Sequence, residues 1–205
     1  MTLNKIYDMN NIDKIFTEDI NVFSKAYFDY LKKVCDNIDV LEIKEFISVL
    51  LEARENDSTI FFMGNGGSAA TASHFANDLA FGLNASVPFK VLSITDNVSV
   101  LTALGNDYGY DNIFTEQLKV YGKKGDVLVG ISASGNSKNI LGAFEYASSM
   151  GILTVALTGF DGGQMKLVAD QGIHVPTGMK EYGPSEDAHL IIDHLISSYL
   201  MRAIN

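Results

Sequence analysis

A glycine-rich turn between a strand-like run and a helix-like run constrains the fold of this chain more than any other feature. Residues 58–63 form a β-branched and aromatic run typical of a buried strand, and residues 64–68 (GNGGS) follow directly. An alanine-rich helix is predicted to begin after this turn. A strand, a glycine turn and a helix N-terminus present unpaired backbone N–H groups to an anion, and the missing Cβ atoms let a ligand approach. The stretch therefore predicts an α/β fold with a polar ligand at this turn.

The turn matches neither of two common nucleotide-binding signatures. Ala69 stands where the dinucleotide fingerprint G-x-G-x-x-G requires its last glycine, and the Gly-Lys-Ser/Thr ending of a P-loop is absent. A glycine turn that only packs a helix against a strand is the alternative interpretation. A second polar cluster is needed to favour ligand binding.

Strand-like and helix-like segments alternate after residue 58. Apolar runs typical of strands lie at residues 58–63, 89–94, 126–132, 152–158 and 171–176. Helices are predicted at residues 111–121, 137–150, 162–169 and 186–202, and a loop is predicted at residues 105–110. Thr95 or Asp96 is expected to cap the helix after the second strand. The alternation predicts a doubly wound, five-stranded parallel sheet with ligands beyond the carboxyl ends of its strands.

Two amphipathic helices are predicted before the first strand, at residues 12–37 and 40–54. We interpret residues 1–205 as a single domain, in which residues 1–57 form a helical extension and residues 58–205 form the α/β core. The first helix carries aromatic residues on several faces, so we expect it to contact another subunit. Packing against its own domain is the alternative.

Composition excludes several classes of partner. The net charge of −10 and the pI of about 4.7 argue against nucleic acid, since no basic patch is visible. The single cysteine, Cys35, favours a reducing compartment. No apolar run approaches the length of a membrane span, and the first residues lack a signal-peptide core. We therefore expect a cytoplasmic protein without membrane contact.

Serine hydroxyls crowd the turn after the third predicted strand. Ser132, Ser134 and Ser137 lie close together, and a helix is predicted to begin at the end of this turn. Short hydroxyls and backbone N–H groups can surround a phosphate without any lysine, aided by the helix dipole at about 0.3–1 kcal/mol per charge. A helix cap needs only one hydroxyl. The cluster therefore favours a phosphate site.

Histidines and carboxylates stand at helical spacing on two predicted helices. His74 and Asp78 are four residues apart and share one face of the helix after the glycine turn. The closing helix carries Glu186, Asp187, His189, Asp193 and His194. Glu186 and His194 lie about 80° apart around that helix, on neighbouring faces. These residues could hold a divalent metal such as zinc or transfer a proton, within one chain or across a subunit boundary.

Not every histidine has the same claim to a functional role. His194 lies among apolar residues, so a structural role is the alternative for it. A functional role is no better supported for His189 than for His194, and it is less well supported for His174, which lies within the fifth predicted strand.

Five motifs in the same order resemble the sugar isomerase (SIS) domain family, and more narrowly its phosphoheptose isomerases. They are GNGGS, HFA, GNDYG, SASGNS and LTG, and the resemblance runs from about residue 10 to the C-terminus. It implies a flavodoxin-like strand order and a homotetramer. It also implies an isomerase that interconverts sedoheptulose 7-phosphate and D-glycero-D-manno-heptose 7-phosphate through an enediol, supplying heptose for lipopolysaccharide or capsule.

The same resemblance implies a role for each matching residue. The phosphate would be held by Ser132, Ser134 and Ser137. The remaining substrate contacts would come from Asn65, Gly66, Ser68, Asp96 and Glu186. One zinc ion per subunit would be held by His74, Asp78, Glu186 and His194. Asp78 would act as the base and His194 as the acid, although a carboxylate that ligates zinc is not free to act as a base.

The chain departs from the family pattern at several of these positions. Asp78 replaces a glutamate and is one methylene shorter, and Glu186 replaces a glutamine and adds a negative charge. Gly183 stands where an acidic residue is expected, and Ala133 where threonine is usual. A related ketose or aldose phosphate is therefore an alternative substrate. A non-catalytic SIS module that binds a phosphosugar or a protein partner is the alternative function.

Overall fold

The computed structural model describes residues 10–83 and 87–204 and contains a five-stranded sheet. The strands are β1 (Thr59–Gly64), β2 (Lys90–Ser93), β3 (Val127–Ser132), β4 (Leu153–Thr158) and β5 (Gln171–His174). Their order is β2-β1-β3-β4-β5, and every neighbouring pair is parallel. The predicted doubly wound fold, its five strands and the flavodoxin-like order are confirmed. The strand order reverses between β1 and β3, so a ligand is expected beyond the carboxyl ends of these strands.

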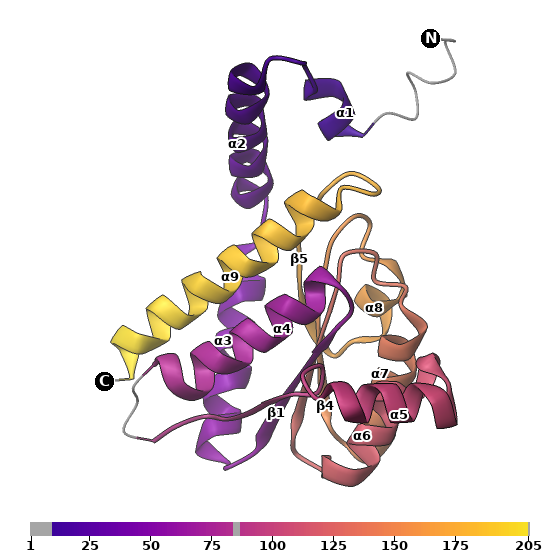
Figure 1. Cartoon of the computed structure of the whole chain (residues 1–205). Coiled ribbons are helices and arrows are strands. Elements are labelled where there is room, and N and C mark those ends of the chain that lie inside the picture. The colour runs from indigo at the N-terminus through magenta and orange to yellow at the C-terminus, as the bar shows by residue number, and fades with distance from the viewer. Residues whose placement is uncertain (1–9, 84–86, 205) are drawn as a thin grey trace.

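Helices cover both faces of the sheet (Figure 1). One face carries α3 (Val40–Glu55), α4 (Gly67–Asn77) and α9 (Tyr182–Ala203). The other carries α6 (Ile113–Tyr121), α7 (Lys138–Met150) and α8 (Gly163–Val168). Along β1, Phe62 points into the first core, whereas Phe61 and Met63 point into the second. Because both faces are buried, the strands read as continuous apolar runs in the sequence.

The helix α4 lies close against the end of β1. Phe75 of α4 packs on Phe62 of β1 and on Phe46 of α3, with ring centroids 4.9 and 6.0 Å apart. A Cβ atom at Gly64 would lie 2.4 Å from the carbonyl oxygen of Ser68, so a larger residue would push the helix away. These contacts fix the N-terminus of α4 at the carboxyl end of the sheet, where the ligand is expected.

The predicted loop at residues 105–110 is wrong for most of its length. Helix α5 (Val98–Tyr108) runs through it and ends at Gly109, whose φ of +83° favours glycine. The predicted caps are also wrong, because Asn97 takes this position. Its Oδ1 accepts a hydrogen bond of 3.1 Å from the Val100 N–H.

Other helix boundaries also differ from those predicted. The first predicted helix is divided into α1 (Asn11–Ile15) and α2 (Ile20–Asp36), because Asp19 caps the second. Two short helices, η2 (Asp78–Gly82) and η3 (Tyr110–Asn112), follow α4 and α5. In the described part of the chain, no helix combines the length and apolar character needed to cross a bilayer.

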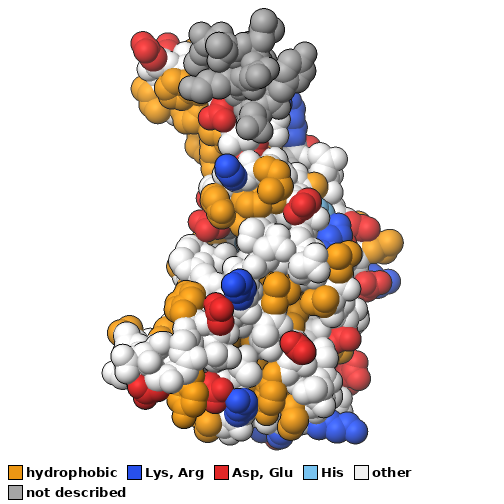
Figure 2. Space-filling view, turned by 90° about the vertical axis from the view of Figure 1, so that its right-hand side faces the viewer, with side chains coloured by type: hydrophobic (Ala, Val, Ile, Leu, Met, Phe, Trp, Pro, Cys, Tyr) orange, Lys and Arg blue, Asp and Glu red, His pale blue; other side chains and the backbone are white. Residues whose placement is uncertain are grey.

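The helices α1 and α2 project from the α/β core (Figure 1). Only Val34 of α2 is buried, whereas Ile20, Val22 and Phe28 are exposed. Figure 2 shows apolar side chains gathered on this projecting part of the molecule. Two tyrosine hydroxyls of α2 donate hydrogen bonds to the region where α9 begins. The Tyr27 hydroxyl donates to the Asp187 carboxylate at 2.5 Å, and the Tyr30 hydroxyl donates to the Glu181 carboxylate. The predicted subunit contact of this helix stays a prediction that the exposed apolar side chains favour.

Candidate active site

The serine-rich turn after β3 gathers hydroxyl groups at one point. The Oγ atom of Ser132 lies 3.4 Å from both the Ser134 Oγ and the Ser137 Oγ. Ser137 occupies the N-cap position of α7, yet its side chain makes no capping hydrogen bond. Its hydroxyl is therefore free for a ligand, and a simple capping role does not explain this residue. The geometry suits a tetrahedral oxyanion at the N-terminus of α7.

The serine-rich turn lines a cavity of about 170 Å³, which we call the serine pocket. Residues of the turn between β1 and α4 and of α9 line the same cavity. Asn65 and Ser68 come from the glycine turn, and Tyr182 and Glu186 from the first turns of α9. Asn65 is held in place because its Oδ1 accepts hydrogen bonds from the Tyr110 hydroxyl at 2.7 Å and from the Asn139 amide at 2.9 Å. The pocket thus joins three of the predicted segments, and it also includes Tyr182, which no sequence pattern had singled out.

The remaining predicted substrate residues lie at the edges of this pocket or apart from it. Gly66 caps α4 with a φ of +56°, and open space surrounds the position of its missing Cβ. The Asp96 carboxylate accepts hydrogen bonds from the hydroxyls of Ser73, Ser93 and Thr95 at the end of β2, and it does not line the serine pocket. In the described chain, Asp96 therefore orders this loop.

Glu186 lies against the first residue of α4. A Cβ atom at Gly67 would come within 2.2 Å of its Oε2, so glycine makes room for this carboxylate. Burial raises the pKa of Glu186, and the nearby Asp187 adds to the effect. Glu186 therefore lines the serine pocket and is not part of the cluster that contains the two predicted histidine ligands.

The histidine cluster lies farther along α4 and α9. It comprises His74, Asp78, Asp193 and His194, whose nearest ligand atoms all lie within 4.8 Å of one another. The Nε2 atoms of His74 and His194 are 3.1 Å apart, and the His74 Nε2 is 3.6 Å from the Asp78 Oδ2. The structure therefore brings together three of the four predicted metal ligands within one chain. Asp193 occupies the place predicted for Glu186.

Asp193 was not assigned a role from the sequence. Its side chain is fully buried, and Ser197 donates a hydrogen bond of 3.1 Å to its Oδ1. Burial first, and then the charge of Asp78, raise the pKa of Asp193 to about 7, and the Ser197 hydrogen bond opposes this. The sequence feature that could have indicated a role for Asp193 is its position inside the apolar run LIIDHLI, because an unpaired charge is rare in such a run.

The cluster fits a divalent metal. Ligand atoms around a tetrahedral zinc with bonds of 2.0–2.1 Å are roughly 3.4 Å apart, which lies within the range of separations found here. Two imidazoles and two carboxylates also form a donor set that suits zinc and similar cations. The buried Asp193 Oδ2 has no hydrogen-bond partner among the described residues, so it can serve as a ligand atom.

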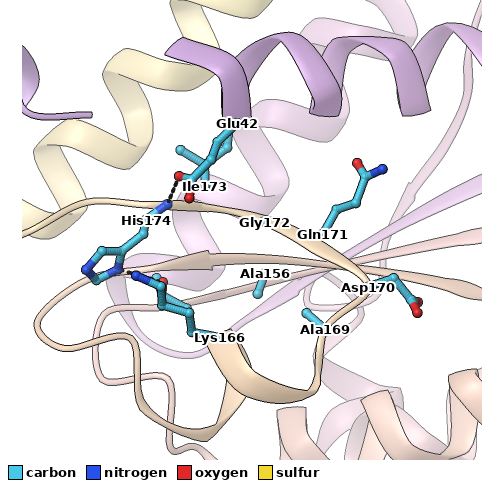
Figure 3. A pocket seen from close by; sticks show the side chains of 10 residues that line it. Glu42, Ala156, Lys166, Ala169, Asp170, Gln171, Gly172, Ile173 and His174 are labelled. Carbon is cyan, nitrogen blue, oxygen red and sulfur yellow. Dashed lines mark hydrogen bonds between the residues drawn. The ribbon is translucent and has the colours of Figure 1, made fainter. Parts of the chain in front are cut away.

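Two other histidines lie outside both the serine pocket and the histidine cluster. His189 is fully buried, and burial lowers its pKa to about 4 although the nearby Thr158 backbone favours the protonated form. His174 lines a cavity of about 190 Å³ beside β5 together with Lys166 (Figure 3). Its backbone N–H donates to the Glu42 Oε2 at 2.8 Å. Neither position favours a role in the site.

The buried His189 gives the fold a pH dependence with a definite sign. Its ordinary pKa of 6.5 falls to about 4 in the folded state, so the unfolded chain takes up the proton first as the pH falls. We expect the free energy of unfolding to drop by roughly 3 kcal/mol between pH 6.5 and pH 4 through this residue. Urea unfolding of His189→Gln should show a shallower decrease over this range. An unchanged pH slope in the variant would contradict this expectation.

The chain is similar to proteins of one family along most of its length. A family model described as SIS domain matches residues 26–159. The phosphoheptose isomerase of Sulfurimonas denitrificans is 40% identical over 184 residues, covering 88% of this chain and 92% of the relative. That of Helicobacter pylori is 38% identical over 178 residues, covering 86% and 91%.

Solved structures give the same result. The phosphoheptose isomerase of Neisseria gonorrhoeae superposes with a TM-score of 0.78 at 32% identity, covering 86% of this chain and 96% of that one. The enzyme of Francisella tularensis superposes with a TM-score of 0.79 at 26% identity, covering 95% and 100%. The residues that the family model matches include α4, the glycine turn before it and the serine-rich turn after β3.

Proposed function

This chain belongs to the SIS domain family and to the phosphoheptose isomerases within it, and we propose that it interconverts sedoheptulose 7-phosphate and D-glycero-D-manno-heptose 7-phosphate. The phosphate would occupy the serine pocket, and the carbonyl end of the sugar would reach the histidine cluster. We place the reaction in the cytoplasm, in line with the lone Cys35 and a phosphorylated substrate.

One observation supports this proposal above the others, namely the spacing of the two sites along α4 and α9. These helices pack side by side, and both begin at the serine pocket (Figure 1). Helical rise places His74 and His194 about 10–12 Å farther along than Gly67 and Glu186. An extended seven-carbon sugar phosphate spans about 9–10 Å from phosphorus to its first carbon, at roughly 1.2 Å per bond. A heptose phosphate is therefore comparable in length to the spacing of these residues along the two helices.

Asp78 and His194 are the residues proposed to move protons. Asp78 would take the proton from the carbon beside the carbonyl and return it to the neighbouring carbon, while His194 would transfer a proton between the two oxygens. Atoms and electrons balance without an oxidant or reductant. Asp78 begins η2, a π-helical turn of a kind that is frequent at functional sites. Zinc, when bound, would polarise the carbonyl oxygen.

The proposal is tested by an activity assay on the purified protein. Conversion of sedoheptulose 7-phosphate, measured with and without added zinc, is the expected result. A panel of shorter ketose phosphates is the matched comparison, because the spacing of the two sites predicts lower kcat/KM for them. Binding of the sugar phosphate without conversion would indicate the non-catalytic module instead. Preference for a shorter sugar would contradict the spacing argument.

We also propose that residues 1–57 contribute to a homotetramer through α2. The exposed Ile20, Val22 and Phe28 would be covered by other subunits, since exposed apolar side chains gathered on one helix are unfavourable in water. The hydrogen bonds of Tyr27 and Tyr30 would hold this helix in a fixed direction for assembly.

Replacing Phe28 by Glu is expected to dissociate the tetramer. Phe28 is 68% exposed within one chain, so the substitution leaves the subunit core intact but places a charge in the proposed interface. Light scattering coupled to size-exclusion chromatography should detect smaller species at micromolar concentration. Lys44→Glu, at an exposed position of α3, is a matched control for a change of charge outside α2. A tetramer that survives Phe28→Glu would contradict this interface.

A further inference from the structure

The carboxylate of Glu181 is buried where the first helices of the chain meet the start of α9. We call α1 and α2, which lie above α9 in Figure 1, the N-terminal arm. Glu181 is 2% exposed and stands at the N-cap position of α9, yet its side chain does not cap that helix. Its Oε1 accepts a hydrogen bond from the Asn11 N–H, and its Oε2 accepts from the Tyr30 hydroxyl and from the Gly178 N–H at 2.7 Å. The carboxylate therefore joins both helices of the arm to the segment before α9.

The turn from Gly178 to Glu181 is shaped by this carboxylate. The Glu181 N–H donates to the Gly178 carbonyl oxygen at 3.2 Å, and a Cβ atom at Gly178 would lie 2.6 Å from the Glu181 Oε1. Within the turn, Lys180 has a φ of +65°, which residues other than glycine rarely adopt. Such a conformation persists only where the surrounding contacts hold it. A change at the Glu181 carboxylate is therefore expected to relax the turn.

Helix α9 begins directly after this turn, and its first residues line the serine pocket. Tyr182 and Glu186 contribute to the pocket wall. The ring of Tyr182 stands edge-on to that of Phe160, with ring centroids 5.1 Å apart. Ser185 donates a hydrogen bond of 2.9 Å to the Glu181 carbonyl oxygen, so the first turn of α9 follows any movement of Glu181. One wall of the serine pocket is thus attached to the N-terminal arm through Glu181.

We propose that Glu181 is a positioning residue that couples the N-terminal arm to the affinity of the serine pocket for a phosphoryl group. Only the placement of that group in the pocket is taken from the proposed function. When the arm is docked on Glu181, Tyr182 and Glu186 are held in place and the phosphoryl group binds more tightly. Because coupling between two sites is reciprocal, binding of the phosphoryl group also stabilises the docked arm.

A second contact between α2 and α9 provides a matched control. The Tyr27 hydroxyl donates to the Asp187 carboxylate at 2.5 Å, and neither residue lines the serine pocket. Asp187 is exposed, in contrast to the buried Glu181. Removing the Tyr27 hydroxyl therefore loosens α2 at the surface but leaves the contacts of Glu181 in place. The comparison separates a general loosening of the arm from the specific role of Glu181.

The test measures the binding of inorganic phosphate to variants of the full-length protein by calorimetry. Tyr30→Phe and Glu181→Gln are each expected to raise the Kd for phosphate about tenfold, since each removes a hydrogen bond that involves a buried charge. Tyr27→Phe is expected to stay within about twofold of the unmodified protein. With sedoheptulose 7-phosphate, KM should rise in parallel, whereas kcat at saturating substrate should change by less than about twofold.

Hydrogen exchange supplies a readout that a purely structural role of Glu181 would not change. Added phosphate should slow the exchange of backbone amides in α1 and α2 of the unmodified protein, and it should have much less effect in Glu181→Gln. The amides of the central strand β1 should exchange equally slowly in both proteins, which shows that the variant is folded. Tyr30→Phe, which leaves the carboxylate in place, repeats the comparison should Glu181→Gln misfold.

Several results would overturn the proposal. They are unchanged phosphate affinity in both Tyr30→Phe and Glu181→Gln, an equal loss in Tyr27→Phe, and exchange in the unmodified arm that does not respond to phosphate. Absence of phosphate binding in the unmodified protein would overturn it as well. Isomerisation without any effect of the arm would leave the proposed function intact. Phosphate binding that depends on Glu181, without isomerisation, would overturn only the proposed function.

Discussion

Replacing Asp78 by Asn is expected to lower kcat for the heptose phosphate by about 10²–10⁴-fold, because an amide cannot accept the proton from the substrate carbon. Asn has nearly the same size as Asp, so the η2 turn that carries residue 78 should be retained. The binding of sedoheptulose 7-phosphate should remain measurable, since the serine pocket is untouched. His194→Gln is expected to give a comparable loss because it removes the acid. Steady-state kinetics and calorimetry with the sugar phosphate separate the two effects.

Two controls accompany this prediction. Asp57→Asn changes an exposed aspartate that pairs with Lys90 before the start of β1, at the other end of the strand from the site, and its kcat should be unchanged. Asp78→Glu restores the longer side chain expected from the family and should keep measurable activity. Full activity in Asp78→Asn or in His194→Gln would exclude the proposed proton transfer.

The features that the sequence predicted correctly depend on local patterns. The five strands were found because each is a short apolar run followed by a polar turn, and burial on both faces makes such runs continuous. Ser132, Ser134 and Ser137 were grouped because neighbouring residues in a turn stay close in any fold. His74 and Asp78 were paired by helical spacing, which fixes their relative position before the fold is known.

The features that the sequence did not predict depend on contacts between distant segments. Glu186 and Asp193 lie on the same helix, and only the way in which α9 packs against α4 decides which of them approaches His74. Helical periodicity cannot supply that information, because it relates residues of one helix to each other and not to a second helix. The helix after the second strand was predicted, but its last turn in α5 was taken for a loop, for another reason. Gly105 and Asn106 are weak helix formers, yet the helix continues through them because it packs on α6 and η3.

The second large expected effect is on the binding of the substrate, because the proposed function places the phosphate in the serine pocket. Replacing Ser132 and Ser137 together by Ala is expected to raise KM for sedoheptulose 7-phosphate by roughly 10²-fold or more. Each hydrogen bond to a charged phosphate contributes about 1.5–3 kcal/mol, and every 1.4 kcal/mol corresponds to a factor of ten. The stability of the fold should change little, because Ser137 makes no capping hydrogen bond and the Gly135 N–H that donates to the Ser132 Oγ also donates to the Ser132 carbonyl oxygen. The kcat at saturating substrate should fall much less than in Asp78→Asn.

This second prediction has its own control and its own contradiction. Ser148→Ala, at an exposed position near the end of α7, removes a hydroxyl from the same helix without touching the pocket and should leave KM unchanged. Inorganic phosphate should compete with the sugar in the unmodified protein and should compete much more weakly in the double variant, because both ligands would use the same hydroxyls. An unchanged KM in the double variant, or competition by phosphate that persists at full strength, would show that the phosphoryl group binds elsewhere. In that case the spacing between the serine pocket and the histidine cluster would no longer determine the length of the sugar.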